Sequence, residues 1–345
     1  MTAPSPDTVP MVSVVTVAFG VEPWLPLAVD TALASRGVRA EVILVDNGGT
    51  EGQLDELGQR VGVTVVGSGD NVGFAAACNL GVAASTGAFV ALLNPDTQVA
   101  PDALAELVAV AARSGVGVAT AAVVMAEDHD VLTSAGNAVH FLGVSWGGWF
   151  GDRCEDHPSE RPATAASGAG MVCRREVWEA LGGFPDAFFA YYEDAELSLR
   201  IWQRGLEVIY VPTAVVVHRY EFSRNPIKYR LLERNRLAMV LTCYGPRQLL
   251  VTLPMLVAFE MVMVVYAAAE GWLPAKLSGY VWLARHWRWL RSRRADVQAQ
   301  RTVTEASLVP LFSDRLQPGN LPPPRALVPF DRVLRAYWHL ARRVV

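Results

Sequence analysis

Carboxylates follow two of the apolar runs in this sequence, where they could take part in chemistry. Asp46 follows the run 41–45, and Asp96 follows the run 88–93 within Asn94-Pro95-Asp96. At the end of a strand, the Asp46 carboxylate could accept hydrogen bonds from a base or ribose. The Asp96 carboxylate, at the end of a central strand, could hold Mg²⁺ or Mn²⁺, which can bridge a diphosphate. One Asp makes an incomplete metal site, so a second ligand must come from elsewhere in the chain. An Asp that only caps the following turn or helix fits the same spacing.

A second acidic group opens a helical pattern. Glu193 and Asp194 begin the amphipathic segment 193–204, where a carboxylate that meets a substrate hydroxyl can act as a general base. Acidic residues at a helix N-terminus also complement the helix dipole without any catalytic role. His218 ends a later apolar run, and it fits either a metal ligand or a buried core histidine.

Two further segments could meet a phosphate. Asn71-Val72-Gly73-Phe74 marks a helix start, where free N–H groups and the helix dipole favour an anion. Gly73 would let a ligand approach the backbone closely, although an ordinary capped turn has the same residues. Arg234-Asn235-Arg236 lies on a basic helical segment, where it could contact either a diphosphate or solvent.

Four apolar runs predict the strands that position these residues: 12–18, 41–45, 63–67 and 88–93. Such runs are typical of parallel strands covered on both faces. Helical patterns at 24–35, from Asn71 through Ala84 and at 101–112 complete β-α-β units. These units predict an α/β fold with a mostly parallel sheet. Ligands bind such sheets at the carboxyl ends of the strands, where Asp46, Asn71 and Asp96 fall.

The following part of the chain is less regular. Residues 125–162 are rich in Gly, Trp and His, and we expect an active-site loop or a small antiparallel section there. Regular patterns return as a segment at 168–174, a short helix at 175–181, the helix 193–204, and two strands at 208–211 and 214–217.

The charge is divided unequally along the chain. Residues 1–220 hold 11 Arg and Lys against 26 Asp and Glu, a balance of −15, and residues 221–345 hold 19 against 8, a balance of +11; the sum is the net −4. An acidic half that binds an anionic ligand needs a cation between them. A basic, apolar half suits an anionic membrane surface.

Two segments of the basic half have the composition of a membrane-associating region. Residues 249–269 form a 21-residue apolar stretch, about the thickness of a bilayer core. Residues 282–294 then carry five Arg and three Trp, residue types that suit the headgroup layer. Because Pro254 and Glu260 interrupt the apolar stretch, we expect an interfacial helix or a short hairpin. A buried helix followed by a solvated basic helix is the alternative.

These patterns divide the chain into four parts. We expect a flexible N-terminus at 1–10, a catalytic domain at 11–240, a membrane-associating helical segment at 241–295, and a Pro-rich, basic tail at 296–345. No basic-then-apolar leader opens the sequence, so we expect the catalytic half in the cytoplasm. The four cysteines lie far apart without a CxxC pair, which indicates reduced, buried thiols.

The motifs, in their order, closely resemble those of inverting family-2 glycosyltransferases with the GT-A fold, and most of all the bacterial rhamnosyltransferase branch. The resemblance covers residues 11–240 and is carried by TVAFG at 16–20, VDNGG at 45–49, NVGFAAACN at 71–79, LNPDT at 93–97, GGFPDAFF at 182–189, YEDAELSLRIWQRG at 192–205, and His218. It implies transfer of a sugar from a nucleotide diphosphate to a hydroxyl of a cell-envelope or lipid-linked glycan.

The resemblance also implies a role for each matching residue. Nucleotide-sugar binding falls to Thr16, Ala18, Asp46, Asn71, Gly73, Phe74, Asn94, Asp96, Gly168, Ala169 and Gly170. The metal, Mg²⁺ or Mn²⁺, would be held by Asp96 and His218, and Asp194, beside Glu193, would be the general base. Asn94 stands where the family commonly has the first Asp of Asp-x-Asp, and Phe19-Gly20 replaces the usual Tyr-Asn.

The expected partners follow from the same resemblance. They are dTDP-rhamnose as the first donor and a UDP-sugar as the second, a glycan or polyprenyl-linked acceptor, and the cytoplasmic face of the plasma membrane, with peripheral or monotopic attachment. We expect no nucleic-acid partner. Two other enzyme classes fit poorly: residues 18–27 (AFGVEPWLPL) contain no Lys or Arg for a nucleotidyltransferase phosphate loop and no GxGxxG for a dinucleotide. A non-catalytic membrane scaffold would not need Asp96 or Asp194.

Overall fold

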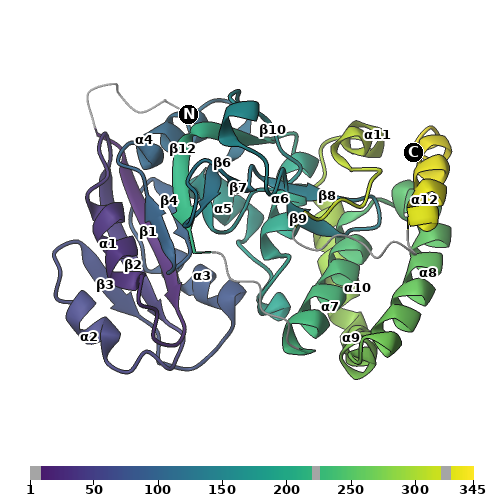
Figure 1. Cartoon of the computed structure of the whole chain (residues 1–345), viewed down its shortest axis with the longest axis horizontal. Coiled ribbons are helices and arrows are strands. Elements are labelled where there is room, and N and C mark those ends of the chain that lie inside the picture. Colours follow the sequence, from purple (N-terminus) through teal and green to yellow (C-terminus); the bar gives the residue numbers. More distant parts are fainter. Residues whose placement is uncertain (1–8, 220–225, 320–327) are drawn as a thin grey trace.

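The computed structural model describes residues 9–219, 226–319 and 328–345. Most of the expected flexible N-terminus at 1–10 and part of the expected Pro-rich tail, residues 320–327, therefore lie outside the described residues. Figure 1 shows a sheet with helices on both of its faces and a group of C-terminal helices at one end of it. This arrangement is the mixed α/β fold that the sequence predicts.

The described residues form a ten-stranded sheet in the order β10-β12-β6-β11-β4-β1-β2-β3, with β5 paired to β12 and β7 to β6. Its strands are β1 (Met11–Ala18), β2 (Arg39–Asp46), β3 (Val63–Val66), β4 (Phe89–Leu93), β5 (Thr97–Val99), β6 (Val116–Met125), β7 (Leu132–Ser134), β10 (Arg161–Pro162), β11 (Gly170–Arg174) and β12 (Glu207–His218). Strand β11 runs antiparallel between β4 and β6, whereas β1, β2, β3 and β4 are parallel. The four predicted N-terminal strands are all confirmed.

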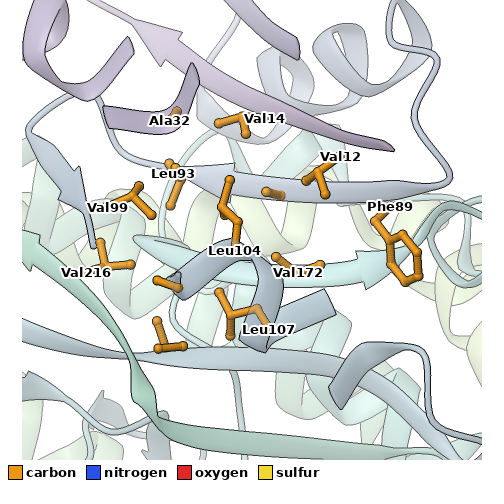
Figure 2. Close-up of a cluster of buried hydrophobic side chains, with 14 of the residues drawn as sticks. Val12, Val14, Ala32, Phe89, Leu93, Val99, Leu104, Leu107, Val172 and Val216 are labelled. Atoms are coloured by element: carbon orange, nitrogen blue, oxygen red, sulfur yellow. The ribbon is translucent and has the colours of Figure 1, made fainter. Parts of the chain in front are cut away.

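Helices cover both faces of the sheet. Around it lie α1 (Leu25–Leu33), α2 (Gln53–Leu57), α3 (Phe74–Ala83), α4 (Ala103–Ala111), α5 (Arg175–Leu181) and α6 (Glu193–Gln203). On one face Val12 and Val14 of β1 pack with Leu104 and Leu107 of α4, as Figure 2 shows. On the opposite face the strands pack against α3, α5 and α6. Strands covered on both faces explain why the apolar runs lack polar alternation.

One strand was not predicted, and one expectation for the strands was wrong. Residues 116–124 had no predicted element, yet they belong to β6. Their four Val and one Thr favour a strand, although one Gly and three Ala interrupt the run. Residues 208–211 and 214–217 were expected as separate strands, yet β12 runs through both. Its pairing with β6 shifts register between Val211 and Val215, and this irregularity accommodates Pro212 within the strand.

The irregular stretch 125–162 contains a small antiparallel section, as expected. It is the two-stranded sheet of β8 (Asn137–Val139) and β9 (Ser145–Gly147). The C-terminal helices are α7 (Pro226–Cys243), α8 (Pro246–Ala269), α9 (Leu273–Arg285), α10 (Trp287–Ala299), α11 (Glu305–Leu308) and α12 (Val328–Ala341). The basic segment 282–294 is thus shared between two helices that meet at His286. Residue 240, the expected domain boundary, lies inside α7.

The C-terminal helices share a buried core with the catalytic part of the chain. Leu199 of α6, Met239 of α7, Phe259 of α8 and Leu290 of α10 belong to one apolar cluster, together with Val139 of β8. A buried ion pair reinforces this packing, because Glu196 of α6 is bound by Arg200 at 2.7 Å and by Arg293 of α10 at 2.7 Å. Burial would raise the pKa of Glu196, but the two arginine charges outweigh it and lower the pKa.

Helix α8 is long and apolar enough to cross a membrane by length and composition alone, and only 17% of its most apolar window is buried. Its exposed face is an apolar stripe formed by Leu250, Leu253, Val257, Met261 and Val265. We call these five residues the α8 stripe. The opposite face, including Leu256 and Phe259, packs on the rest of the protein.

Glu260, which interrupts the apolar stretch, belongs to a buried charge cluster. It forms ion pairs with Arg236 of α7 and with Lys276 of α9, the latter at 2.8 Å, and accepts a 2.6 Å hydrogen bond from the Tyr280 hydroxyl. Glu233 of α7 also pairs with Arg236 and Lys276. These contacts turn the Glu260 carboxylate towards α7 and α9, at the edge of the α8 stripe, where Glu260 lines a groove together with Val257 and Met261. It therefore ties α8 to α7 and α9.

Candidate active site

The carboxyl ends of β1, β2 and β4 bring several of the predicted residues to one edge of the sheet. Ala18 is the register partner of Asp46, and Leu93, directly before Asn94, pairs with Gly170 of β11. The Asp46 carboxylate accepts hydrogen bonds from Gly48 N at 3.1 Å and from the Thr50 hydroxyl at 3.4 Å. The other predicted residue of β1, Thr16, is buried, as is Ala18, whereas Phe19 directly after them is 61% exposed.

The loops after β2 and β3 are joined by two asparagines. Asn47 donates a 3.2 Å hydrogen bond to the Asn71 side chain and accepts one of 2.9 Å from Val72 N. Asn71 in turn accepts a 3.1 Å bond from Gly73 N. This network holds the segment that leads into α3, which begins at Phe74.

Gly73 is required by its surroundings. Its φ of +87° favours glycine, and a Cβ there would lie 2.5 Å from the Phe189 ring. Phe189 O also accepts a 3.0 Å hydrogen bond from Ala75 N in the first turn of α3. At the helix start that we expected to face an anion, one N–H group thus donates its hydrogen bond to a protein carbonyl.

Asp96 and His218 lie together although 122 residues separate them in the sequence. The pairing of β5 with β12 sets His218 opposite Thr97, and His218 Nε2 is 3.2 Å from an Asp96 carboxylate oxygen. The Asn94 amide is 3.4 Å from the same ring nitrogen. Thr97 fixes the connecting turn by donating a 2.7 Å hydrogen bond to Asn94 O.

This donor set suits a divalent metal that shares its coordination with a ligand. A carboxylate oxygen and an imidazole nitrogen are both available, but within the described ranges no group of three or more His, Cys, Asp and Glu side chains could hold a metal. Two protein ligands leave most positions of a six-coordinate ion to oxygens from elsewhere, as at sites where Mg²⁺ or Mn²⁺ binds a substrate diphosphate.

Asp194 is held by hydrogen bonds at the start of α6. One carboxylate oxygen accepts bonds from the Asn137 side chain at 3.1 Å and from Gly168 N at 3.2 Å, and the other accepts one from Ala195 N at 2.7 Å. Burial raises the pKa of Asp194, and these hydrogen bonds oppose that rise because they favour the charged form. The side chain stays partly exposed.

The neighbouring Glu193 has a different environment. Its side chain is buried, and one of its carboxylate oxygens has no hydrogen-bond partner. Burial and the nearby Asp194 charge raise its pKa to about 8. Of the two adjacent acids, Asp194 is therefore the one whose hydrogen bonds favour a negative charge, and Glu193 is the one whose burial disfavours it.

Gly168 and Phe74 lie beside Asp194, as expected for a common site. A Cβ on Gly168 would be 3.8 Å from the Asp194 carboxylate and 3.9 Å from the Phe74 ring. Gly168 and Ala169 precede β11, and Gly170 opens it next to the end of β4. One strand pairing therefore links the segment around Asp194 to the turn that carries Asn94 and Asp96.

Some residues of this region were missed or misread in the sequence. Asn137 lies in the irregular stretch, where no local pattern marks it as a partner of Asp194. Arg234, Asn235 and Arg236 were expected to meet a diphosphate or solvent, but all three are at least 95% buried. Their side chains bind the protein, because Arg234 and Asn235 donate to backbone carbonyls of residues 187–191 and Arg236 joins the charge cluster.

Comparison with solved structures identifies the fold as that of GT-A glycosyltransferases. A structure of GalNAc-T7 with UDP, GalNAc and Mn²⁺ matches with a TM-score of 0.56 and 20% identity, over 70% of this chain and 49% of that one. The mannosyltransferase PcManGT from Pyrobaculum calidifontis, in complex with GDP-Man and Mn²⁺, matches with a TM-score of 0.51 and 20% identity, over 99% of this chain and 88% of that one. At this identity the likeness concerns the fold.

Sequence comparison then gives the family. The model of glycosyl transferase family 2 matches residues 13–182. An N-acetylglucosaminyl-diphospho-decaprenol L-rhamnosyltransferase of Mycobacterium tuberculosis is 31% identical over 216 residues, which cover 54% of this chain and 70% of that protein. The O-antigen biosynthesis protein RfbC of Myxococcus xanthus is 30% identical over 150 residues, 41% of this chain and 12% of that protein. The chain belongs to glycosyl transferase family 2, and it resembles rhamnosyltransferases within it.

The raised pKa of Glu193 predicts a pH-dependent effect of Glu193→Gln on stability. An acid whose pKa rises from 4.5 in the unfolded chain to about 8 in the folded one stabilises the fold fully below the lower value. That contribution is lost as the pH rises through the higher value. The amide copies the protonated acid at every pH. We expect nearly equal free energies of unfolding near pH 4 and a stability gain of the variant that grows up to pH 8, by at most about 1.4 kcal/mol per pH unit.

Urea unfolding at the two pH values measures this gain. Glu207→Gln, at an exposed position, is the matched control and should show no such trend. The same pH dependence in wild type and Glu193→Gln would contradict the raised pKa.

Proposed function

We propose that this glycosyltransferase is metal-dependent and inverting, and that it moves rhamnose from a nucleotide diphosphate to a hydroxyl of a lipid-linked glycan. The observation that carries the proposal is the presence of two separate polar centres near one edge of the sheet. One is Asp96 with His218, 3.2 Å apart, and the other is Asp194, held by Asn137 and Gly168. Metal binding and proton removal need two such centres.

The donor is proposed from the relatives. The Mycobacterium tuberculosis protein is an L-rhamnosyltransferase by name, which supports dTDP-rhamnose first, with UDP-sugars second. In the proposed complex, Asp46 contacts the nucleoside, with Thr16 and Ala18 behind it, and Asn71, Gly73 and Phe74 form the pocket floor. Asn94 and the segment Gly168-Ala169-Gly170 lie beside the sugar or the acceptor.

The metal site is proposed at Asp96 and His218. A divalent cation held there would neutralise the diphosphate as it leaves with the electrons of the broken sugar bond. The acidic balance of residues 1–220 makes this neutralisation necessary. Imidazole is a softer ligand than the all-oxygen shell that Mg²⁺ prefers, so the donor set favours Mn²⁺, the ion present in the GalNAc-T7 and PcManGT structures.

Asp194 is the proposed general base. Its hydrogen bonds to Asn137 and Gly168 favour the ionised form and fix one carboxylate oxygen, while its partial exposure leaves it accessible to an acceptor. The acceptor hydroxyl would give its proton to Asp194 and attack the anomeric carbon opposite the leaving diphosphate. A single direct displacement inverts the configuration at that carbon. Holding both substrates in line contributes much of the rate enhancement.

The metal proposal predicts that transfer stops in chelator and returns with Mn²⁺. A panel of nucleotide sugars, assayed by released nucleotide with an acceptor of the lipid-linked type, should give the highest rate with dTDP-rhamnose. Asp96→Asn should raise the Mn²⁺ concentration needed for half-maximal rate at least tenfold, because it removes the carboxylate of the proposed metal site. Full activity of the wild type in chelator would contradict metal dependence.

The base proposal predicts that Asp194→Asn abolishes transfer while donor binding stays nearly unchanged. The amide keeps the shape of the side chain but cannot accept the proton, and loss of a general base costs about 10²–10⁴-fold in rate. Calorimetric titration with the donor and steady-state transfer rates measure the two effects. Wild-type turnover in Asp194→Asn together with an inactive Glu193→Gln would show that the other carboxylate is the base.

We further propose that the C-terminal helices hold the enzyme at the cytoplasmic face of the plasma membrane, as a peripheral or monotopic protein. The support is the α8 stripe, together with an apolar groove of about 540 Å³ between α7, α8 and α9 that opens beside Val257 and Met261. Exposed Trp287 and three exposed arginines, Arg285, Arg288 and Arg291, add headgroup contacts. The decaprenol-linked acceptor in the name of the Mycobacterium tuberculosis relative fits such a location.

Two of the five arginines in residues 282–294 bind other parts of the protein and do not contribute to the proposed membrane-binding surface. Arg293 binds Glu196, and Arg294 donates to Leu241 O and Tyr244 O. The electrostatic share of membrane binding thus comes from the three exposed ones, at about 1 kcal/mol each near an anionic surface.

The membrane proposal predicts that Val257→Gln with Met261→Gln weakens binding to vesicles of anionic phospholipid about tenfold or more. The reason is that two exposed apolar side chains no longer enter the bilayer interface. Co-sedimentation measures binding, and added salt should weaken the arginine share alone. Val61→Gln, at a position 96% exposed in the acidic half, is the control. Wild-type protein that stays in solution with vesicles would show that the α8 stripe faces another protein surface.

A further inference from the structure

The segment directly before the proposed base has an unusual backbone. Phe189, Tyr191 and Tyr192 have φ values of +66°, +71° and +72°, a region that residues with a Cβ rarely adopt. Such a backbone conformation is strained, and it persists only where its surroundings hold it. Tyr192 immediately precedes Glu193 and Asp194 at the start of α6. The contacts that hold this segment therefore also set where α6 begins.

Two side chains of α7 make those contacts. The Asn235 amide nitrogen lies 2.9, 2.8 and 2.8 Å from the carbonyl oxygens of Phe188, Ala190 and Tyr191. Arg234 donates to Phe188 O at 2.6 Å and to Ala187 O at 3.1 Å.

The two side chains are also bound to each other. Arg234 Nε donates a 2.8 Å hydrogen bond to the Asn235 side-chain oxygen. That bond fixes the orientation of the amide, so its NH₂ group points at the carbonyls. Asn235 is fully buried and Arg234 is 5% exposed, so solvent does not compete for their hydrogen bonds.

We propose that Asn235, oriented by Arg234, is a positioning residue for Asp194, an inference that rests on the proposed role of Asp194 as the base. Asn235 touches neither carboxylate. It binds the carbonyls of the segment in which Phe189, Tyr191 and Tyr192 have positive φ and from which α6 starts. Asp194 is the second residue of α6. The same segment carries Phe189, which packs on Gly73 and accepts from Ala75 N. One amide thus sets the base and the start of α3 together.

The amide is itself held in place by the C-terminal helices. Helix α7 packs against α6, α9 and α10. On α7, Glu233 lies two residues before Asn235 and Arg236 lies one residue after it. Both belong to the charge cluster with Glu260 of α8 and Lys276 of α9. Moving α7 would therefore break both the cluster and the contacts to residues 187–191.

Asn235→Asp tests the proposal in the full-length protein. The variant keeps the size of the side chain and its bond to Arg234, but it replaces the NH₂ group that faces the three carbonyls. We expect kcat to fall about 10- to 100-fold, because a small displacement of a reacting group has effects of this size. KM for the donor should stay within about twofold, and amide hydrogen exchange of residues 187–195 should become faster.

Thr242→Val is the matched control. Thr242 is buried on the same helix, and its hydroxyl donates only within α7, to Ala238 O at 2.8 Å, and more weakly to Met239 O. It should lower the melting temperature without lowering kcat. Arg234→Lys, which loses the contacts of the guanidinium to Ala187 and Phe188, should lower kcat in the same direction by a smaller factor. If Asn235→Asp does not fold, the kcat of Arg234→Lys tests the proposal instead.

Each outcome separates this inference from the proposed function. If Asp194→Asn is inactive while Asn235→Asp and Arg234→Lys keep the wild-type kcat, positioning by α7 is overturned and the base assignment stands. A rise in KM at unchanged kcat overturns it as well. If Asp194→Asn turns over normally, the proposed role of Asp194 as the base fails, and the inference that Asn235 positions a base there fails with it.

Discussion

A buried carboxylate, Glu196, is the interaction on which the arrangement of the site depends. It lies one turn after Glu193, is completely buried, and is bound by Arg200 of its own helix and by Arg293 of α10. Removing one partner of such a buried ion pair costs about 3–5 kcal/mol, because a charge is left without compensation. Arg200 also donates to Leu181 O and Gly183 O. Helix α6 is thereby fixed both to the turn after α5 and to the C-terminal helices.

The fold around this helix could largely be predicted from the sequence. Strands β1 to β4 were evident because their residues are apolar on both faces and end in polar loops. Strand β6 was not, because one Gly and three Ala interrupt its β-branched residues and the apolar run is less evident there. The single strand β12 was read as two, because Pro212 looks like a break when the partner β6 is unknown.

The candidate site could be predicted in its residue types but not in its support. The nearness of Asp96 to His218 came from family resemblance, and the structure explains it by a pairing between the three-residue strand β5 and the end of β12, which no local pattern indicates. Asn137 was not assigned to the site, and Asn235 was considered only as part of a segment that could contact a diphosphate or solvent, because a hydrogen bond across the fold leaves no periodic signal. Arg234 and Arg236 were misread because basic residues on a polar helix are usually solvated, whereas here buried carbonyls and carboxylates compensate them.

The ion pair between Glu196 and Arg293 also has a consequence for how the protein is made. The two residues are 97 positions apart in the chain, so at usual rates of synthesis Glu196 leaves the ribosome roughly 5–20 s before its partner does. During that interval α6 has Arg200 but lacks Arg293, and α10, against which α7 also packs, is still incomplete. The acidic start of α6 therefore reaches its final geometry only once the C-terminal helices have been synthesised. A nascent chain that carries the whole sheet is still an immature enzyme.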